Sequence, residues 1–547
     1  MTFTLLVFLP VWLQASTVIY GEKGDPLSTL AIFWWFWYHR ATGLPLDPNP
    51  FLGAPEGVPI KLGYAPLPLL AYWLSATVGE VMAYNLIVLV SFPLAALTMY
   101  HLAWYLTRQH TAAVLAGLAF AFLPYHQGIA RAHFGLAQVQ WLPWLVLALL
   151  QLAEGLTFPR LSFLGVCLAL NALVDYHYAL FGALVAALFL VGMLVSRPAR
   201  HRLLARRPVR WEYLLPALLA LGLAAVVTIA PYLALRAGRN ELPPSLWRRP
   251  LTQLYQYSAR PWEYLLPPPT HGLFGSLTAS FFQSHDHRSF LHEQSLYLGY
   301  IVLGLAALGW VWLGLERRPG WWLLPGVGVM GFLFSLPPFW ELGTLRIPLP
   351  AAFLYELVPF MRSYSRFGVL VGLAAVALAG VGLAWLLVRL DHRPRWRIMV
   401  LVLTSGGLLL EFFPYPLPIV DVTDAPPVYR WLAQQPGDLV AEYPLVRSDE
   451  PGYYDYYPWV RIHHKRLVNG APLGSPQEAD RIQMQDPADP RAVALLAGRS
   501  VRYILLHLDR FPPGRRPSCA VDGLALVAQF GETVVCAVEG VQVHTPE

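Results

Sequence analysis

Residues 20–43 have the sequence YGEKGDPLSTLAIFWWFWYHRATG, which determines how the chain is interpreted. The charged residues Glu22, Lys23 and Asp25 follow directly on residues 1–20, an apolar stretch as long as a membrane-spanning helix. The run IFWWFWY is typical of a helix at headgroup depth, where tryptophan side chains concentrate. The segment therefore predicts a first membrane span at 1–20 and then a loop with a helix in the membrane interface.

The composition extends this interpretation to most of the chain. Of 547 residues, 56% are hydrophobic and 13% are charged, with a mean hydropathy of +0.46. A soluble protein has about 25% charged residues, so the composition predicts a polytopic membrane protein. The net charge of +6 comes from arginines in short runs between apolar segments. That pattern reports membrane topology and excludes a nucleic-acid-binding protein.

Eleven segments have the length and apolar character of a membrane span. They lie near 1–20, 84–106, 111–126, 138–154, 159–174, 177–195, 213–235, 295–315, 321–340, 367–388 and 398–417. A further segment, 65–79, is short and rich in proline, which favours a second interfacial helix in the first loop.

The basic loops orient these spans. If 65–79 does not cross the membrane, every short basic loop, including the six arginines of 197–210, falls on the cytoplasmic side. The chain is then predicted to be a multi-pass protein of the cytoplasmic (inner) membrane with a cytoplasmic N-terminus. The outer segments are 21–83, 124–137, 237–294, 341–366 and everything after 418.

Charged residues return after Leu417, and helical and strand patterns alternate. Residues 426–438 and 489–498 predict helices, 439–445 and 501–509 predict strands, and 524–538 predicts two strands around a turn. The chain is thus divided into a transmembrane domain, 1–417, and a small extracytoplasmic α/β domain, 418–547. No phosphate-binding glycine loop, HExxH, GxSxG or CxxC motif occurs anywhere in the sequence.

The three cysteines are too few for a disulfide scaffold. Cys167 lies in an apolar stretch and is interpreted as a packing residue. Cys519 and Cys536 lie in the C-terminal domain, where a disulfide forms only outside the reducing cytoplasm. Sequence does not give their separation, so pairing remains open.

Two interpretations of Asp25 remain open. The residue precedes Pro26 and a helical pattern, so it is a candidate helix cap. A carboxylate at the outer end of a helical bundle is also a candidate catalytic group. Arg131 and His133, between two spans, are either ordinary loop residues at headgroup level or ligands of an anionic group in a polar cavity.

Asp175 and His177 lie in a very short connection at the membrane edge. Such a pair is more often a hydrogen-bonded helix cap than a metal site, because a metal needs further ligands, which Asp25 or Glu56 would have to provide. The segment 285–299 is rich in histidine without regular ligand spacing, and its Glu293 is also explained as a charge favoured at a helix N-terminus.

Arg362 and Arg366 lie one helical turn apart at the outer mouth of a span. Two arginines at this spacing can together bind a phosphate. Arginines that extend to lipid headgroups produce the same pattern, so both interpretations stand.

These features together resemble the bacterial integral membrane proteins of the GT-C glycosyltransferase superfamily. The resemblance rests on three sequence motifs near the N-terminus. They are the tripeptide Gly-Asp-Pro (24–26) between the first span and an aromatic helix, the tripeptide Pro-Glu-Gly (55–57), and the tripeptide Ala-Tyr-Asn at the start of the second span. The resemblance extends over most of the chain through loose, hydrophobic motifs, namely AFAFLPYHQGIARAHFGLAQVQWLPW, YLLPPPTHGLFG at 264–275, RSYSRFG, VYRWLAQQPGD and LVNG.

The resemblance implies a GT-C-like fold and a membrane glycosyltransferase that uses a polyprenyl-phosphate-linked sugar. It implies Asp25 as the base for the acceptor hydroxyl, and Arg131, His133, Arg362 and Arg366 as candidates for the donor phosphate. Glu56, Asp175, His177 and Glu293 are further candidates in the outer cavity. Some members need a divalent metal such as Mg²⁺ or Mn²⁺. Many have two neighbouring acidic residues in the first loop, whereas Asp25 has only Glu22 nearby, so the metal requirement stays open.

Two other functions compete with transfer. A scaffold or assembly subunit could keep the fold without activity and bind a protein partner through its C-terminal domain. A transporter of a lipid-linked sugar is less favoured, because the spans contain almost no ionisable residues in their interior. The expected partners are a polyprenyl-phosphate-linked sugar and membrane lipids, and the C-terminal domain is a possible site for a protein partner.

Overall fold

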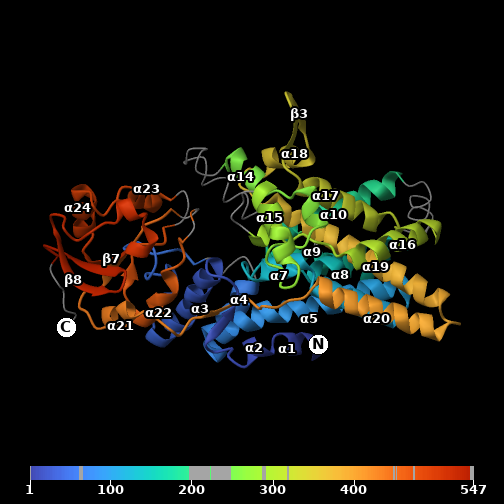
Figure 1. Cartoon of the computed structure of the whole chain (residues 1–547), viewed down its shortest axis with the longest axis horizontal. Coiled ribbons are helices and arrows are strands. Elements are labelled where there is room, and N and C mark those ends of the chain that lie inside the picture. The colour runs from blue at the N-terminus through green and yellow to red at the C-terminus, as the bar shows by residue number, and fades with distance from the viewer. Residues whose placement is uncertain are drawn as a thin grey trace. The chain divides into compact units, whose positions relative to one another are not determined.

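The computed structural model describes residues 2–60, 66–195, 222, 248–285, 291–316, 320–447, 450, 452–471 and 475–541. The predicted span at 213–235 and the arginine run at 197–210 lie outside these residues. The chain divides into two units, whose helices and strands are labelled in Figure 1. Unit 1 comprises Met1–Leu9, Tyr64–Leu67 and Ile87–Leu417, and unit 2 comprises Pro10–Gly63, Pro68–Leu86 and Pro418–Glu547.

Unit 1 is an assembly of apolar helices. Its helices are α1 (Thr2–Val7), most of α5 (Glu80–Thr107), α6 (His110–Ala121), α7 (Pro124–Ala130), α8 (Trp141–Ala153), α9 (Phe158–Val174), α10 (Tyr176–Val195), α14 (Leu251–Gln256), α15 (Gly275–His285), α16 (Tyr300–Glu316), α17 (Leu323–Ser335), α18 (Pro350–Leu357), α19 (Gly368–Arg389) and α20 (Pro394–Glu411). Short 3₁₀ turns η1 (Pro261–Tyr264), η2 (Leu291–Gln294) and η3 (Tyr364–Phe367) lie between them. In the described part of the chain, four helical stretches are long and apolar enough to span a membrane: Glu80–Thr107, His110–Ala130, Tyr176–Val195 and Tyr364–Arg389.

Helix α19 forms the buried centre of unit 1 and packs against α6, α16 and α17. Its contact with α16 depends on small residues. A Cβ at Gly382 would lie 2.0 Å from the carbonyl oxygen of Leu305, and one at Gly309 would lie 1.9 Å from that of Leu378. The two backbones approach so closely that only glycine fits, which is the usual way in which helices pack tightly inside a membrane.

The predicted span at 1–20 is wrong as a continuous helix. Helix α1 ends at Val7, α2 covers only Leu9–Trp12, and the chain then turns into strand β1 (Val18–Tyr20). Pro10 contributes no backbone donor, and the Asn85 side chain binds the main chain of Tyr20 and Val18 at 2.9 and 2.7 Å. The other predicted spans within the described residues each overlap helical residues, although 111–126 is divided between α6 and α7 and 321–340 runs into strand β2 (Phe339–Leu342).

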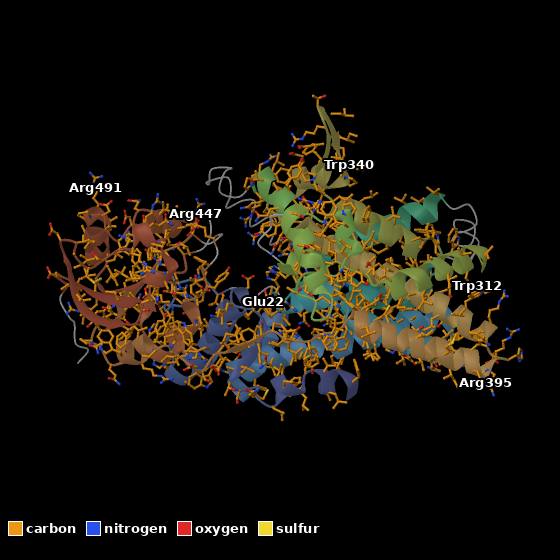
Figure 2. All side chains as sticks on the ribbon, in the orientation of Figure 1. Glu22, Trp312, Trp340, Arg395, Arg447 and Arg491 are labelled. Atoms are coloured by element: carbon orange, nitrogen blue, oxygen red, sulfur yellow. A yellow bond between two sulfur atoms is a disulfide. The ribbon has the colours of Figure 1, made fainter. Side chains whose placement is uncertain are left out.

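The polar ends of unit 1 carry exposed side chains. Trp340, in the hairpin of β2 (Phe339–Leu342) and β3 (Leu345–Pro348), extends away from the helices, as Figure 2 shows. Arg395, in one of the short basic loops that are predicted to be cytoplasmic, is exposed at the start of α20 (Figure 2).

Unit 2 contains a five-stranded mixed sheet in the order β6-β5-β7-β9-β8. Its strands are β5 (Leu439–Tyr443), β6 (Arg466–Leu467), β7 (Val501–His507), β8 (Leu524–Phe530) and β9 (Thr533–Val538). Strands β6, β5 and β7 are parallel, and β7, β9 and β8 are antiparallel. The helices are α3 (Asp25–Thr42), α4 (Pro66–Val78), α21 (Pro427–Ala433), α22 (Val460–His463), α23 (Pro476–Ile482) and α24 (Pro490–Gly498), with short 3₁₀ turns η4 (Tyr457–Trp459), η5 (Leu508–Arg510) and η6 (Pro513–Arg515).

Part of the first predicted outer loop belongs to unit 2 together with the C-terminal residues. Strand β1 pairs with β4 (Ile419–Asp421), so that Val18 lies opposite Asp421. Glu80 forms an ion pair with Arg461 at 2.8 Å. This division differs from a single cut at 417, because the loop supplies strands, helices and ion-pair partners to the same compact body.

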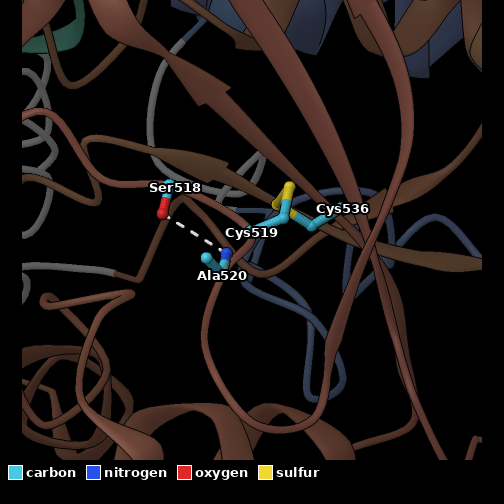
Figure 3. The surroundings of a disulfide bond; sticks show 4 residues. All are labelled: Ser518, Cys519, Ala520 and Cys536. Carbon is cyan, nitrogen blue, oxygen red and sulfur yellow. Dashed lines mark hydrogen bonds between the residues drawn. A yellow bond between two sulfur atoms is a disulfide. The ribbon is translucent and has the colours of Figure 1, made fainter.

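Cys519 and Cys536 form a disulfide, with Cα atoms 5.6 Å apart (Figure 3). Cys536 is buried in the sheet core on β9, and the Ala520 amide beside the bridge donates to Ser518 Oγ. The pairing that the sequence left open is present in the structure. Cys167 is buried with a free thiol, in agreement with its interpretation as a packing residue.

A buried histidine makes the stability of unit 2 depend on pH. Burial lowers the pKa of His463 to about 3, and His464 and Lys465 act in the same direction. The unfolded chain binds the proton near pH 6.5 and the folded chain does not, so stability is complete above about pH 6.5 and falls as the pH decreases towards 3. At pH 5 the loss from this residue is about 2 kcal/mol.

We therefore expect the His463→Phe variant to lose less thermal stability between pH 7.5 and pH 5 than the wild type. The measurement is thermal unfolding of the full chain at both pH values, with the exposed His110→Phe as the control. An equal loss in His463→Phe and the wild type would contradict the assignment.

Candidate functional site

Three connections in unit 1 bring polar side chains together. The first follows α7 and carries Arg131 and His133. The second is Asp175, whose extended backbone separates α9 from α10. The third is η3, which carries Arg366 into the start of α19. Each connection interrupts an apolar helix, so its polar groups lie at the ends of the helices.

A continuous hydrogen-bonded chain links four of the predicted site residues. Asp175 Oδ1 accepts from the backbone amide and from Nδ1 of His177, at 2.8 and 2.7 Å. Arg366 Nη1 lies 3.0 Å from Nε2 of His177, and Nη2 lies 3.3 Å from Nε2 of His133. A guanidinium only donates, so the Nε2 atoms of both histidines are the acceptors in these contacts.

The contacts of Asp175 determine the charge of its carboxylate. Burial alone would raise the pKa of Asp175, but His177 and then Arg366 outweigh it, so the pKa of Asp175 lies below its ordinary value. Asp175 is therefore ionised at neutral pH, and it orients His177, which in turn orients the guanidinium. Arg366 is 8% exposed and His177 is 1% exposed. The result is a rigidly held arginine at the end of a buried helix.

Further arginines lie beside this chain. Arg249, Arg362 and Arg366 all act electrostatically on the Tyr176 hydroxyl, and the guanidinium of Arg362 lies 4.7 Å from the centre of the Tyr257 ring. Sequence reasoning missed Arg249 and Tyr176, because no periodicity or motif connects them to residues more than 70 positions away. We call Arg249, Arg362 and Arg366 the arginine group. Such a group of guanidinium side chains is suited to binding a phosphate.

The remaining predicted residues of unit 1 are less closely connected. Arg131 is half-buried and directly follows α7. The ring of His292 contacts that of His133, with centres 5.3 Å apart. Glu293 lies in η2, next to the buried Gln294, and its side chain is outside the described residues.

Asp25 lies in unit 2, at the first residue of α3. The cap position is occupied by Gly24, whose φ of 127° is available only to glycine at low cost, and no side chain caps this helix end. The interpretation of Asp25 as the cap is therefore wrong. Its half-buried carboxylate acts electrostatically on the Tyr84 hydroxyl, as does Tyr20.

Glu56 has a structural contact in the same unit. Its carboxylate forms an ion pair with Arg481 at 3.2 Å, and the Arg481 guanidinium also donates to the carbonyl of Ala54 at 2.6 Å. This contact joins the PEG segment to α23. The residue therefore holds two parts of unit 2 together, which the sequence did not indicate.

The described residues hold no cluster of metal ligands. In the described ranges, no three His, Cys, Asp or Glu side chains are arranged to hold an ion. His177 directs Nε2 to a guanidinium, and a cation in that place would be repelled. The side chains present are suited to an anion.

Comparison with known proteins supports this description of the fold. No family model and no curated protein matches the chain. Several solved structures resemble it along almost its whole length. The arabinofuranosyltransferase AftD from Mycobacteria matches 98% of this chain with a TM-score of 0.51 and 18% identity. ArnT from Cupriavidus metallidurans, bound to undecaprenyl phosphate, matches 100% of it with a TM-score of 0.50 and 12% identity.

The chain has the fold of the GT-C glycosyltransferases. It covers 39% of the AftD chain and 99% of the ArnT chain. The predicted fold class, a helical multi-pass membrane protein of GT-C type with a small C-terminal α/β region, is thereby confirmed. At these levels of identity the likeness concerns the GT-C fold alone.

Proposed function

We propose that this GT-C protein is a membrane glycosyltransferase that moves a sugar from a polyprenyl-phosphate donor to an acceptor on the outer face of the cytoplasmic membrane. The observation that carries the proposal is the fixed guanidinium of Arg366, held by His133 and His177 beside further arginines. The solved ArnT structure, which shares the fold, contains undecaprenyl phosphate. An arginine group at the end of an apolar helix matches a ligand with a lipid chain and a phosphate.

Transfer requires that negative charge on the phosphate be stabilised as the sugar leaves. The acceptor hydroxyl attacks the anomeric carbon, the bond from that carbon to the phosphate oxygen breaks, and its electron pair departs with the lipid phosphate. Arg366 and Arg362 compensate the charge that develops there, and Arg131 and His133 are further candidates for the same role. Arginines that are oriented in advance do this without reorganising during the reaction.

Transfer also requires that the acceptor hydroxyl lose its proton. We assign the role of general base to Asp25, which the resemblance to the GT-C enzymes implies and whose half-buried side chain lies at the first residue of α3. The proton moves from the hydroxyl oxygen to the carboxylate and then to solvent. General-base assistance of this kind contributes about 10²–10⁴-fold to a rate.

The disulfide supports the proposed orientation. A bond between Cys519 and Cys536 persists outside the reducing cytoplasm, which agrees with an extracytoplasmic C-terminal region and a cytoplasmic N-terminus.

We expect denatured, unreduced protein to react with a thiol reagent at one cysteine, Cys167, and reduced protein to react at three. The measurement is the mass of the alkylated chain after purification from the membrane. Three reactive thiols before reduction would contradict both the disulfide and the orientation that it supports.

The proposed function is tested with the purified full chain in proteoliposomes that contain a polyprenyl-phosphate-linked sugar with a radiolabel in the sugar. We expect the label to move to an added glycan acceptor, and free polyprenyl phosphate to appear in equal amount. Binding of the lipid without release of polyprenyl phosphate would favour the inactive scaffold. Movement of the intact lipid-linked sugar between leaflets would favour a transporter.

A further inference from the structure

Unit 2 contains a cavity of about 400 Å³ to which the transfer step assigns no role. This volume lies within the range of about 300–1,000 Å³ that is typical of small-molecule sites. Trp459 and Tyr429 line it, with their rings stacked 5.3 Å apart at an interplanar angle of 16°. Leu27, Val422 and Pro426 add apolar surface. One wall of the cavity is therefore flat and aromatic.

The polar wall of the cavity has an excess of negative charge. Four aspartates line it, Asp421, Asp424, Asp455 and Asp509, against the cations Lys23 and Arg510 and the imidazole of His507. Asp455 pairs with Arg510 at 2.8 Å. Hydrogen bonds from Thr423 lower the pKa of Asp421, which is therefore ionised at neutral pH. A phosphate or another anion would be repelled here, in contrast to the arginine group of unit 1.

A buried carboxylate fixes two of the lining side chains. Glu442 is fully buried on β5, and its Oε2 accepts from the Tyr429 hydroxyl at 2.7 Å and contacts His507 Nε2 at 2.8 Å. Asn469 in turn binds both the amide and the carbonyl of Glu442. Burying a carboxylate costs free energy. The presence of Glu442 beneath the cavity therefore indicates that fixed positions of Tyr429 and His507 are important for the function of the cavity.

The aspartates do not form a cation site. Within the described residues, no three acidic or histidine side chains converge as metal ligands, and Asp455 is already bound to a guanidinium. Spread around an aromatic wall, the carboxylates instead provide acceptors for several separate hydroxyl groups. The apolar face of a sugar ring packs on an aromatic ring, while its hydroxyls donate to carboxylates.

We propose that this cavity binds a neutral oligosaccharide segment, and that it holds part of the acceptor or product glycan. The identity of the glycan as acceptor rests on the proposed function, whereas the binding itself does not. Trp459 supplies the stacking surface, and Asp424 supplies an acceptor at the rim.

The test is binding of the full chain in lipid nanodiscs, which avoids detergents with sugar headgroups. The probes are an array of neutral hexose and pentose oligosaccharides, with phosphorylated oligosaccharides and polyamines for comparison. We expect at least one neutral oligosaccharide to bind, with the affinity at least tenfold weaker in Trp459→Ala and several-fold weaker in Asp424→Asn. Trp459→Phe, which keeps a ring on Tyr429, should retain most of the affinity.

Trp431→Ala is the matched control, because Trp431 lies on the same helix as Tyr429 but packs against Tyr503 and Phe530, outside the cavity. Its affinity should equal that of the wild type. Binding of only charged probes, no binding at all, or equal losses in Trp459→Ala and Trp431→Ala would overturn the proposal. Oligosaccharide binding is measured without a polyprenyl donor, so the two proposals are tested separately. If the protein transfers sugar but binds no oligosaccharide, only this site is refuted. If it binds an oligosaccharide but transfers no sugar, only the proposed transferase function is refuted.

Discussion

Replacing Arg366 with glutamine is expected to lower the rate of sugar transfer by about 10²–10³-fold, the usual effect of removing one fixed donor from a developing negative charge. Glutamine is uncharged and cannot donate to His133 and His177 at the same time as to a phosphate. Arg366→Lys keeps the charge but loses the planar geometry, so it should recover only part of the rate. The measurement is transfer of radiolabelled sugar in proteoliposomes at saturating donor.

Arg389→Gln is the matched control for this variant. Arg389 ends α19, which begins directly after η3, and the helix has 22 residues. The two arginines are therefore separated by roughly 30 Å along the helix. Transfer by Arg389→Gln should remain near the wild-type rate. Equal losses in both variants, or full activity in Arg366→Gln, would exclude the arginine from the transfer step.

The long apolar helices of unit 1 could be predicted because apolar runs identify them directly, whereas the short helices α14, α15 and α18 were not predicted. The exception at 1–20 is instructive. Hydropathy alone favours one span there, but Pro10 and the side chain of Asn85, 65 positions from Tyr20, favour a broken helix and a strand. A contact over that distance overrides the local pattern. The predicted helices and strands of the C-terminal region were located correctly because their local propensities agree with the final sheet.

The site could be predicted only as a set of separate residues. His177 and Arg366 are 189 positions apart, and no sequence pattern reports that they share a hydrogen bond. The hydrogen-bond partners of Glu411, at the end of α20, could not be predicted from the sequence either. Its carboxylate accepts from the Tyr297 hydroxyl and from the amides of Tyr300 and Ile301, and so binds the start of α16. A charged residue at the end of a span gives no sign of such a partner.

Asp25 shows the opposite case, in which the local pattern was informative but ambiguous. The sequence Gly24-Asp25-Pro26 favours Asp25 as the cap residue, and it also allows a catalytic carboxylate at that position. The structure assigns the cap position to Gly24, because its positive φ is strained for any other residue. Asp25 then occupies the first turn, where its charge interacts favourably with the helix dipole.

If Asp25 is the base, its replacement by asparagine should lower transfer by about 10²–10⁴-fold without unfolding the protein. Asparagine keeps the shape of the side chain and leaves the Gly24 cap intact, but it cannot accept the hydroxyl proton. Donor binding should change little, because the assigned phosphate ligands belong to other residues. Transfer rate, affinity for polyprenyl phosphate and thermal unfolding are measured on the same preparation.

Glu22→Gln provides the control, since it removes a negative charge three residues away and leaves Asp25 in place. A general effect of local charge would reduce transfer equally in both variants, whereas loss of the base affects Asp25→Asn far more strongly. Asp25→Glu should recover part of the rate, because a carboxylate is again present at a slightly different reach. If Asp25→Asn transfers sugar at the wild-type rate, the acceptor is deprotonated by another group, and Asp25 serves only the first turn of α3.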